Sequence, residues 1–243
     1  MLVVTSSLWQ TNAVALRAGD EAMLVDSPYF ADELELLQPM LERSGFRVDG
    51  LLVTHGDWDH LLARLAFPAL ALGLAESTAM RLRAEPGVAQ RELRRADDEY
   101  YVTRERPLSL GSYQALPVPG KLDLGPEELE LHPAEGHTDD GMAIFARWCG
   151  VLICGDYLSD VEIPVVGDRR LYRATLERLR ALVEAADVVV PGHGSPQPRD
   201  EALRILQEDV AYLDALEAGE DRLPPSRDSS VQRRVHAQNA GVS

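Results

Sequence analysis

The sequence predicts a layered α/β protein in which sheets pack on each other and are covered by helices. Short apolar runs typical of strands occur in both halves of the chain, and segments with helical apolar spacing lie between them. At 243 residues, 45% of them hydrophobic, the chain is long enough to bury a continuous core. We expect one domain over residues 1–218 and a polar tail over 219–243, with a short helix at 233–241 as the alternative to a frayed end.

The first half is expected to alternate strands with helices. Its strands are predicted from short, apolar, often β-branched runs at 2–5, 13–18, 22–26, 49–54 and 70–73. Its helices are predicted from apolar residues at helical spacing in 31–45, which ends on glycine, and from the charged stretch 75–102.

The second half begins with a stretch rich in proline and glycine, 106–127, which we expect to be irregular. Strands are then predicted at 128–133, 142–148, 151–156 and 187–191, with a hairpin turn at Cys149-Gly150. Strong periodicity predicts helices at 170–186 and 198–219.

Polar side chains that bind metals gather where predicted strands end. They occur in the loops VTHGDWDH, AEGHTDDG and VPGHGS and after the strand VLICGD. The candidate ligands are His55, Asp57, Asp59, His60, His137, Asp156 and His193. Strand ends in layered α/β proteins meet at a common edge. Four imidazoles and three carboxylates converging there predict a site for two adjacent divalent ions.

These loops resemble the signature of the metallo-β-lactamase-fold hydrolase superfamily. That signature is H-x-H-x-D-H after a strand, then G-H-T, an aspartate after G-D, and a late G-H; this chain has THGDWDH, EGHT, CGDY and PGHG. The match in order and spacing covers roughly residues 1–215. The resemblance implies a four-layer αββα sandwich, a single α/β (α+β) domain with a binuclear metal site at one edge of its sheets.

The resemblance also implies a role for each ligand. His55 and His137 would bind the first metal together with position 57, while Asp59, His60 and His193 would bind the second and Asp156 would bridge the two. Asp26, at the end of AMLVD, matches an acidic residue that supports the site from behind its ligands. A strand-end turn former is the alternative for Asp26.

Position 57 departs from the common pattern, because aspartate replaces the second histidine. This H-x-D-x-D-H version resembles a minority of relatives, and a glutamate there would mark the diiron flavoprotein branch. An anionic oxygen ligand makes Fe²⁺ or Mn²⁺ plausible beside Zn²⁺, our first expectation, and leaves open whether both sites fill.

The implied activity is that of a metal-dependent hydrolase. A metal-bound hydroxide would attack the substrate, and Asp59 would orient this nucleophile and pass a proton to the leaving group. We expect a small ester, thioester or lactone as substrate. The first alternative is a phosphodiesterase or nuclease, with Arg91, Arg94 and Arg95 reaching the phosphate. For these arginines a solvated helix face is the simpler interpretation.

Two alternatives come from other classes. A diiron redox protein normally needs glutamate at position 57 and an electron-carrier domain, and a non-catalytic binding module would have little reason to keep seven ligands. Specificity is expected from residues 75–127. Trp58 and Tyr157 are candidates to line the substrate pocket or to pack in the core. His132 is expected to be structural or at the surface, and His236 and Asn239 are the tail residues that would support the site if the tail is a helix.

The charge balance limits the partners. A formal charge of −16 argues against nonspecific binding to nucleic acid or to an anionic membrane surface. The chain begins without a signal-peptide pattern and has no long apolar run, so we expect a cytoplasmic protein. A small-molecule substrate is the expected partner, and self-association into a homo-oligomer is left open.

Overall fold

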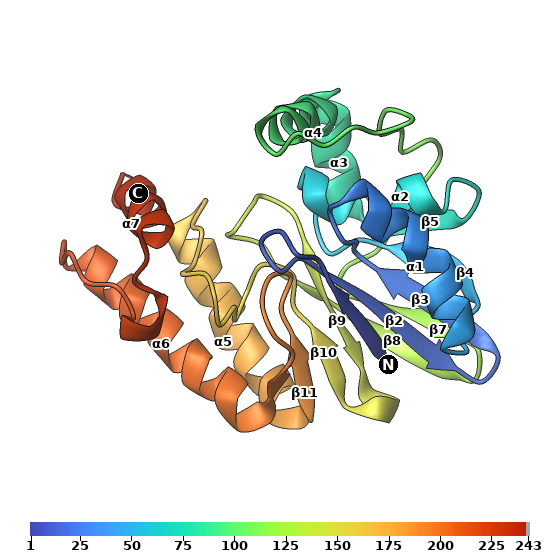
Figure 1. Cartoon of the computed structure of the whole chain (residues 1–243). Coiled ribbons are helices and arrows are strands. Elements are labelled where there is room, and N and C mark those ends of the chain that lie inside the picture. Colours follow the sequence, from blue (N-terminus) through green and yellow to red (C-terminus); the bar gives the residue numbers. More distant parts are fainter. Residues whose placement is uncertain (242–243) are drawn as a thin grey trace.

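The computed structural model describes residues 1–241 and contains two six-stranded sheets packed face to face (Figure 1). The first sheet has the order β1 (Leu2–Thr5), β2 (Asn12–Ala18), β3 (Glu21–Val25), β4 (Val48–Leu52), β5 (Ala71–Ala75) and β6 (Gln114–Leu116). Its first three strands pair antiparallel, and β3 to β6 pair parallel.

The second sheet is mostly antiparallel. Its order is β12 (Gln197–Pro198), β11 (Val188–Val190), β10 (Val151–Ile153), β9 (Met142–Ala146), β8 (Glu127–Pro133) and β7 (Gly120–Leu124). Only β10 and β11 pair in parallel. The hairpin predicted at Cys149-Gly150 joins β9 to β10 through the 3₁₀ turn Arg147–Cys149.

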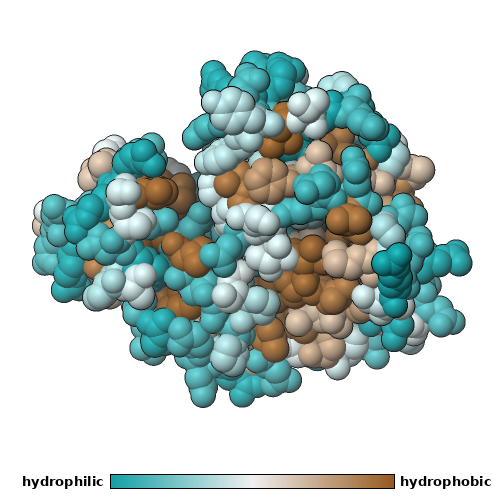
Figure 2. All heavy atoms as spheres, viewed as in Figure 1, coloured by the Kyte–Doolittle hydropathy of each residue, from teal (hydrophilic) through white to brown (hydrophobic). Residues whose placement is uncertain are grey.

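Helices cover the outer face of each sheet, which gives the expected αββα order of layers (Figure 1). On the first sheet lie α1 (Ala31–Arg43), α2 (Ala63–Ala66), α3 (Glu76–Ala84) and α4 (Val88–Glu99). On the second lie α5 (Arg169–Ala185) and α6 (Arg199–Glu217), and α7 (Ser230–Asn239) packs against α6. Hydrophilic residues face outward along these helical layers (Figure 2). No helix in residues 1–241 is long and apolar enough to cross a membrane.

Three apolar clusters hold the layers together. The central one lies between the sheets and includes Val14, Leu16, Leu131, Ile144 and Ile153. The other two fill the spaces between each sheet and its helices. Strand β9, MAIFA, is buried along its whole length because the other sheet covers one of its faces and helices cover the other.

Two predictions about the periphery need correction. Residues 106–127 are not wholly irregular, because they contain β6 and β7, the edge strands of the two sheets. The sequence did not indicate these strands because proline and glycine flank them. An edge strand pairs with only one neighbour and therefore tolerates such residues. The end expected to fray at 233–241 instead forms the alternative, a helix: α7 and the 3₁₀ turn Pro225–Arg227 pack on the domain within residues 219–241.

Candidate metal centre

All seven predicted ligands lie in loops at one edge of the two sheets. His55, Asp57, Asp59 and His60 belong to the loop after β4, which ends in the 3₁₀ turn Trp58–His60. The others come from the second sheet, where His137 lies between β8 and β9, Asp156 follows β10, and His193 follows β11. The convergence of strand ends therefore brings together residues that are far apart in the sequence.

The ligand atoms form two groups with a shared centre. Those of His55, Asp57 and His137 lie within 4.8 Å of one another, and so do those of Asp59, His60 and His193. Asp156 faces both groups, because its Oδ2 lies 3.3 Å from His137 Nε2 and 3.4 Å from His193 Nε2. We call these the first group and the second group, with Asp156 between them.

Each of the four histidines uses Nδ1 within the protein and directs Nε2 at the centre. Nδ1 lies 3.1 Å from Thr54 Oγ1 in His55 and 2.9 Å from Asp26 Oδ2 in His60. It meets backbone carbonyls in the other two, Val165 at 2.9 Å from His137 and Trp9 at 3.1 Å from His193. These partners accept a hydrogen bond from Nδ1–H, so Nε2 is the nitrogen that can bind a cation.

The unpartnered atoms fit a metal. Among the described residues, the buried Nε2 atoms of His55, His60 and His137 and Oδ1 of Asp156 have no hydrogen-bond partner. Buried polar atoms are rarely left in this way, because the loss of hydration is costly. A divalent cation is the ligand that accepts imidazole nitrogens and carboxylate oxygens together.

Asp26 supports the loop after β4 with both of its carboxylate oxygens. Its Oδ1 accepts the Thr54 N–H at 2.8 Å, and its Oδ2 accepts the Thr54 hydroxyl at 2.8 Å as well as facing His60. The Thr54 hydroxyl is thereby directed away from His55 Nδ1, whose proton it can accept. One buried aspartate thus orients two ligand histidines, one directly and one through Thr54.

The loop between β1 and β2 and the first residue of β2, Asn12, hold the loop of His193 in place: the carbonyl of Trp9 faces His193 and that of Gln10 accepts the Gly194 N–H. Asn12 donates from Nδ2 to the carbonyls of Pro191 at 2.9 Å and Gly194 at 2.8 Å. Glycine is required at position 192, since a Cβ there would lie 2.2 Å from Asp156 Oδ1. The backbone of PGHG therefore lies directly against Asp156.

Arg81 of α3 adds a cation that the sequence analysis missed. Its Nη2 lies 2.7 Å from Asp57 Oδ1, and its Nη1 lies 2.7 Å from Oδ1 of the buried Asp140. Asp140 Oδ2 in turn accepts the Gly56 N–H at 2.8 Å. The acidic pair of HTDDG was the available signal, but an arginine within AMRLRAEP looks like an ordinary surface residue.

Charge dominates the ligand cluster. Burial favours the neutral form of His137, but the nearby carboxylates of Asp156 and Asp57 raise its pKa to about 10. Burial likewise opposes the charge of Asp57, yet His137 and His55 hold its pKa well below the ordinary value. The pKa values of His60 and His193 are raised despite burial, in both cases chiefly by the charge of Asp156. The carboxylates therefore hold protons on the imidazoles where a cation would otherwise sit.

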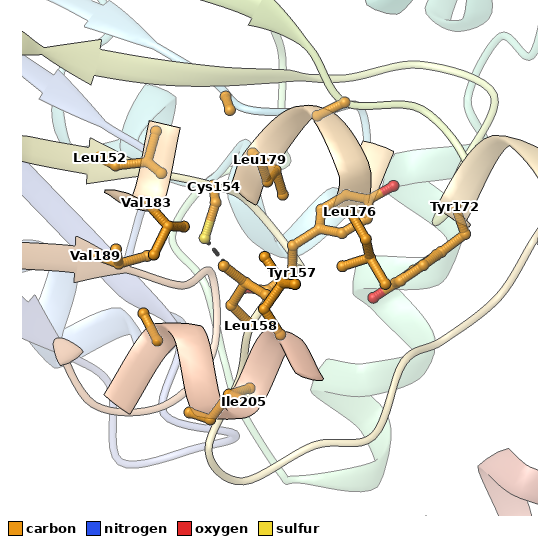
Figure 3. Close-up of a cluster of buried hydrophobic side chains, with 14 of the residues drawn as sticks. Leu152, Cys154, Tyr157, Leu158, Tyr172, Leu176, Leu179, Val183, Val189 and Ile205 are labelled. Atoms are coloured by element: carbon orange, nitrogen blue, oxygen red, sulfur yellow. Dashed lines mark hydrogen bonds between the residues drawn. The ribbon is translucent and has the colours of Figure 1, made fainter. Parts of the chain in front are cut away.

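The other predicted site residues lie around the ligands. Trp58 joins an aromatic cluster, with its ring 5.6 Å from those of Trp9 and Tyr29. Tyr157 lies in the core cluster under α5 (Figure 3), where its hydroxyl donates to the Glu135 carbonyl at 2.7 Å and accepts the His137 N–H at 3.0 Å. Both of its polar contacts are thus within the protein, behind His137.

Residues of α7 reach the site through the loop that follows Tyr157. Asn239 accepts the Val166 N–H at 3.0 Å and donates to the Pro164 carbonyl at 2.6 Å, on either side of the Val165 carbonyl that faces His137. His236 meets the Tyr212 hydroxyl at 3.1 Å, away from the ligands. His132 lies beside Glu130 on β8, outside the site.

The model of the Metallo-beta-lactamase superfamily matches residues 7–193, which include all seven ligands. This chain belongs to that superfamily. Solved structures share the fold. A metallo-beta-lactamase family protein from Thermus thermophilus has a TM-score of 0.67 at 22% identity, over 91% of this chain and 83% of that one.

Two further structures are similar over most of their length. An archaeal superfamily protein from Sulfolobus tokodaii has a TM-score of 0.64 at 16% identity, over 98% of this chain and 93% of that one. The protein TTHA1623, solved in a di-iron-bound form, has a TM-score of 0.60 at 20% identity, over 84% of this chain and 98% of that one. At these identities the likeness concerns the fold.

Proposed function

We propose that this member of the superfamily is a metal-dependent hydrolase acting on a small ester, thioester or lactone. The observation that carries the proposal is the set of buried Nε2 atoms without a hydrogen-bond partner, in His55 and His137 of the first group and His60 of the second, all directed toward Asp156. Residues His55, Asp57 and His137 would hold one divalent ion, and Asp59, His60 and His193 the other. Two such ions supply a water of lowered pKa and polarise the oxygen on which charge develops.

The chain's own residues would orient the reaction. Asp59 is the proposed catalytic residue, because its carboxylate belongs to the second group, with Oδ2 3.3 Å from His193 Nε2, and its side chain keeps 11% exposure. An ionised carboxylate there can accept a proton from the nucleophile and pass it to the leaving group. The pKa of Asp59 is lowered, since the charges of His60 and His193 outweigh its burial, which keeps it ionised as this role requires.

Charge favours a small acyl substrate over a phosphodiester. The arginine beside the predicted ligands, Arg81, is already paired with three carboxylates, those of Asp57, Glu85 and Asp140. Arg91, Arg94 and Arg95 are exposed on α4, where Arg95 pairs with Glu92 at 2.8 Å. With a net charge of −16 the protein also repels polyanions at long range.

The metal is proposed to be zinc, with iron or manganese as alternatives. Imidazole nitrogens suit zinc and iron, and the three carboxylates extend the choice to manganese. Iron gains support from the di-iron-bound form of TTHA1623, a protein of the same fold.

Two measurements test the proposal. Elemental analysis of protein purified without chelators should find close to two equivalents of metal per chain. In a panel of thioesters, lactones, activated esters and phosphodiesters, the loaded protein should hydrolyse members of the first three classes. The Asp59→Asn variant should lose hydrolysis, while Asp123→Asn, an exposed acid on β7, should keep it. Cleavage confined to phosphodiesters would overturn the substrate class, and failure to bind any metal would overturn the hydrolase.

A further inference from the structure

The network of Arg81 singles out the ligand position at which this chain departs from the common motif. We propose that Arg81 is a positioning residue that makes aspartate, rather than histidine, the fitting ligand at position 57. The inference rests on the metal centre of the proposed function and is independent of the reaction catalysed there.

The two carboxylate oxygens of Asp57 have different partners, one in Arg81 and one in the first group. Oδ1 accepts from Arg81 Nη2 at 2.7 Å, while Oδ2 faces the first group, 3.7 Å from His55 Nε2 and 3.5 Å from His137 Nε2. A carboxylate can serve both sides because it accepts in two directions, and a planar guanidinium fixes its orientation. Asp57 would therefore present one oxygen to a cation, in a defined direction.

The second terminal nitrogen of the Arg81 guanidinium, Nη1, is held by a residue other than Asp57. Its Nη1 lies 2.7 Å from Asp140 Oδ1, and the Asp140 side chain is fully buried. Asp140 also holds the Gly56 N–H, the backbone link between His55 and Asp57. A Cβ on residue 56 would come within 3.2 Å of Asp140 Oδ2, so glycine suits this contact. The guanidinium thus remains beside position 57 whatever side chain stands there.

A histidine at position 57 would conflict with this arrangement. An imidazole whose one nitrogen binds a metal offers N–H on the other, and Arg81 carries only donors. The guanidinium would then face a donor and a divalent cation with no carboxylate between them, and like charges in a partly buried site repel strongly. Removing Arg81 should remove this repulsion, so the difference in metal affinity between aspartate and histidine at position 57 should become smaller.

The test is a double-mutant cycle on metal affinity. Four proteins are compared: wild type, Asp57→His, Arg81→Met, and Arg81→Met with Asp57→His. The dissociation constants of both Zn²⁺ equivalents are measured by competition with a chromophoric chelator, and the Co²⁺ absorption spectrum reports coordination. We expect Asp57→His to weaken the affected equivalent at least about tenfold more with Arg81 present than in the Arg81→Met background, within the range typical of outer-shell partners.

The controls separate this effect from general destabilisation. Arg95→Met removes an exposed arginine of α4 and should leave the preference for aspartate unchanged. Because Arg81→Met leaves Asp140 buried without its cation, the cycle is repeated with Asp140→Asn, which keeps an acceptor for the Gly56 N–H. Equal effects of Asp57→His in both Arg81 backgrounds, within about twofold, would overturn the inference.

The outcomes also distinguish this inference from the proposed function. If wild-type protein takes up two equivalents of Zn²⁺ and the cycle shows no coupling, Arg81 has only a structural role and the metal centre stands. If wild-type protein takes up none, the metal centre itself is wrong and the inference falls with it.

Discussion

The two ligand groups are built by different means. In the second group, the side chains of His60, Asp59 and His193 are 0%, 11% and 6% exposed, and their supports are Asp26 and the backbone of the β1–β2 loop. In the first group, the Asp57 side chain is 28% exposed and depends on an ion pair with a helix outside the sheets. We expect supports at the buried sheet edge to open less often than a partly exposed contact with a peripheral helix. We infer that the ligand side chains of the second group are held more rigidly than those of the first group.

The largest effect is expected where the two groups meet. Asp156→Ala removes the carboxylate that faces both, and it leaves the imidazoles of His137 and His193 without their common partner. Both metal equivalents should weaken by more than the roughly 10- to 100-fold typical of outer partners. Chelator competition measures this, and retention of one equivalent at wild-type affinity would show that the groups are independent.

The Asp26→Ala change should weaken metal binding by the second group much more than by the first. The change removes the acceptor of His60 Nδ1 and of the Thr54 hydroxyl and N–H. One equivalent should weaken roughly 10- to 100-fold and the other by much less, since His55 loses only an indirect support. The exposed Asp123→Ala carries the same change of charge and should affect neither equivalent. Equal losses in both equivalents would contradict the division into two supports.

The stability of the metal-free protein should depend on pH through His137. Its pKa is raised to about 10 in the folded protein, against an ordinary value of about 6.5 when unfolded. This histidine therefore contributes its full stability below about pH 6.5, and the contribution is lost as the pH rises toward 10. Denaturant unfolding of metal-free protein across this range should show the decline.

Two controls test whether His137 causes this loss of stability at high pH: metal loading, and substitution of a histidine outside the site. Metal-loaded protein should not lose stability over this pH range, since Nε2 of His137 would then carry no proton. His137→Gln should reduce the slope, whereas His132→Gln, on β8 outside the site, should leave it as in wild type. A slope unchanged in His137→Gln would show that other groups set the pH dependence.

The smallest effect is expected from α7. Asn239→Ala frees the backbone at Pro164 and Val166 and so loosens the carbonyl of Val165 that faces His137. Loss of buried hydrogen bonds should cost about 1–3 kcal/mol of unfolding free energy. The first group should also lose metal affinity by less than it does in Asp156→Ala. The control is Gln238→Ala, at the exposed neighbouring position, which should change neither the unfolding free energy nor the metal affinity. An equal loss in this variant would show that the effect comes from destabilising α7 in general and not from the side chain of Asn239.

Sequence reasoning reached the four layers and the clustering of the seven ligands because both depend on local patterns. Apolar periodicity marks strands and helices, and parallel strands end at one edge. Arg81 and Asp140 were missed because nothing local separates a functional arginine from the other arginines of α3 and α4. Residues 106–127 and α7 were misjudged because edge strands are short and because α7 attaches through polar side chains, Gln232 and Asn239, rather than through an apolar stripe.

The clamp on His193 makes the formation of the site depend on two segments made far apart in time. The second group needs His193, and the loop that holds it pairs with Asn12, a separation of 179 residues to Pro191 and 182 to Gly194. On a ribosome, residues 55–60 emerge long before residue 193, and until then they offer a cation an incomplete set of ligands. Metal uptake at full affinity must therefore wait until residue 193 has been translated and its loop has met the segment around Asn12.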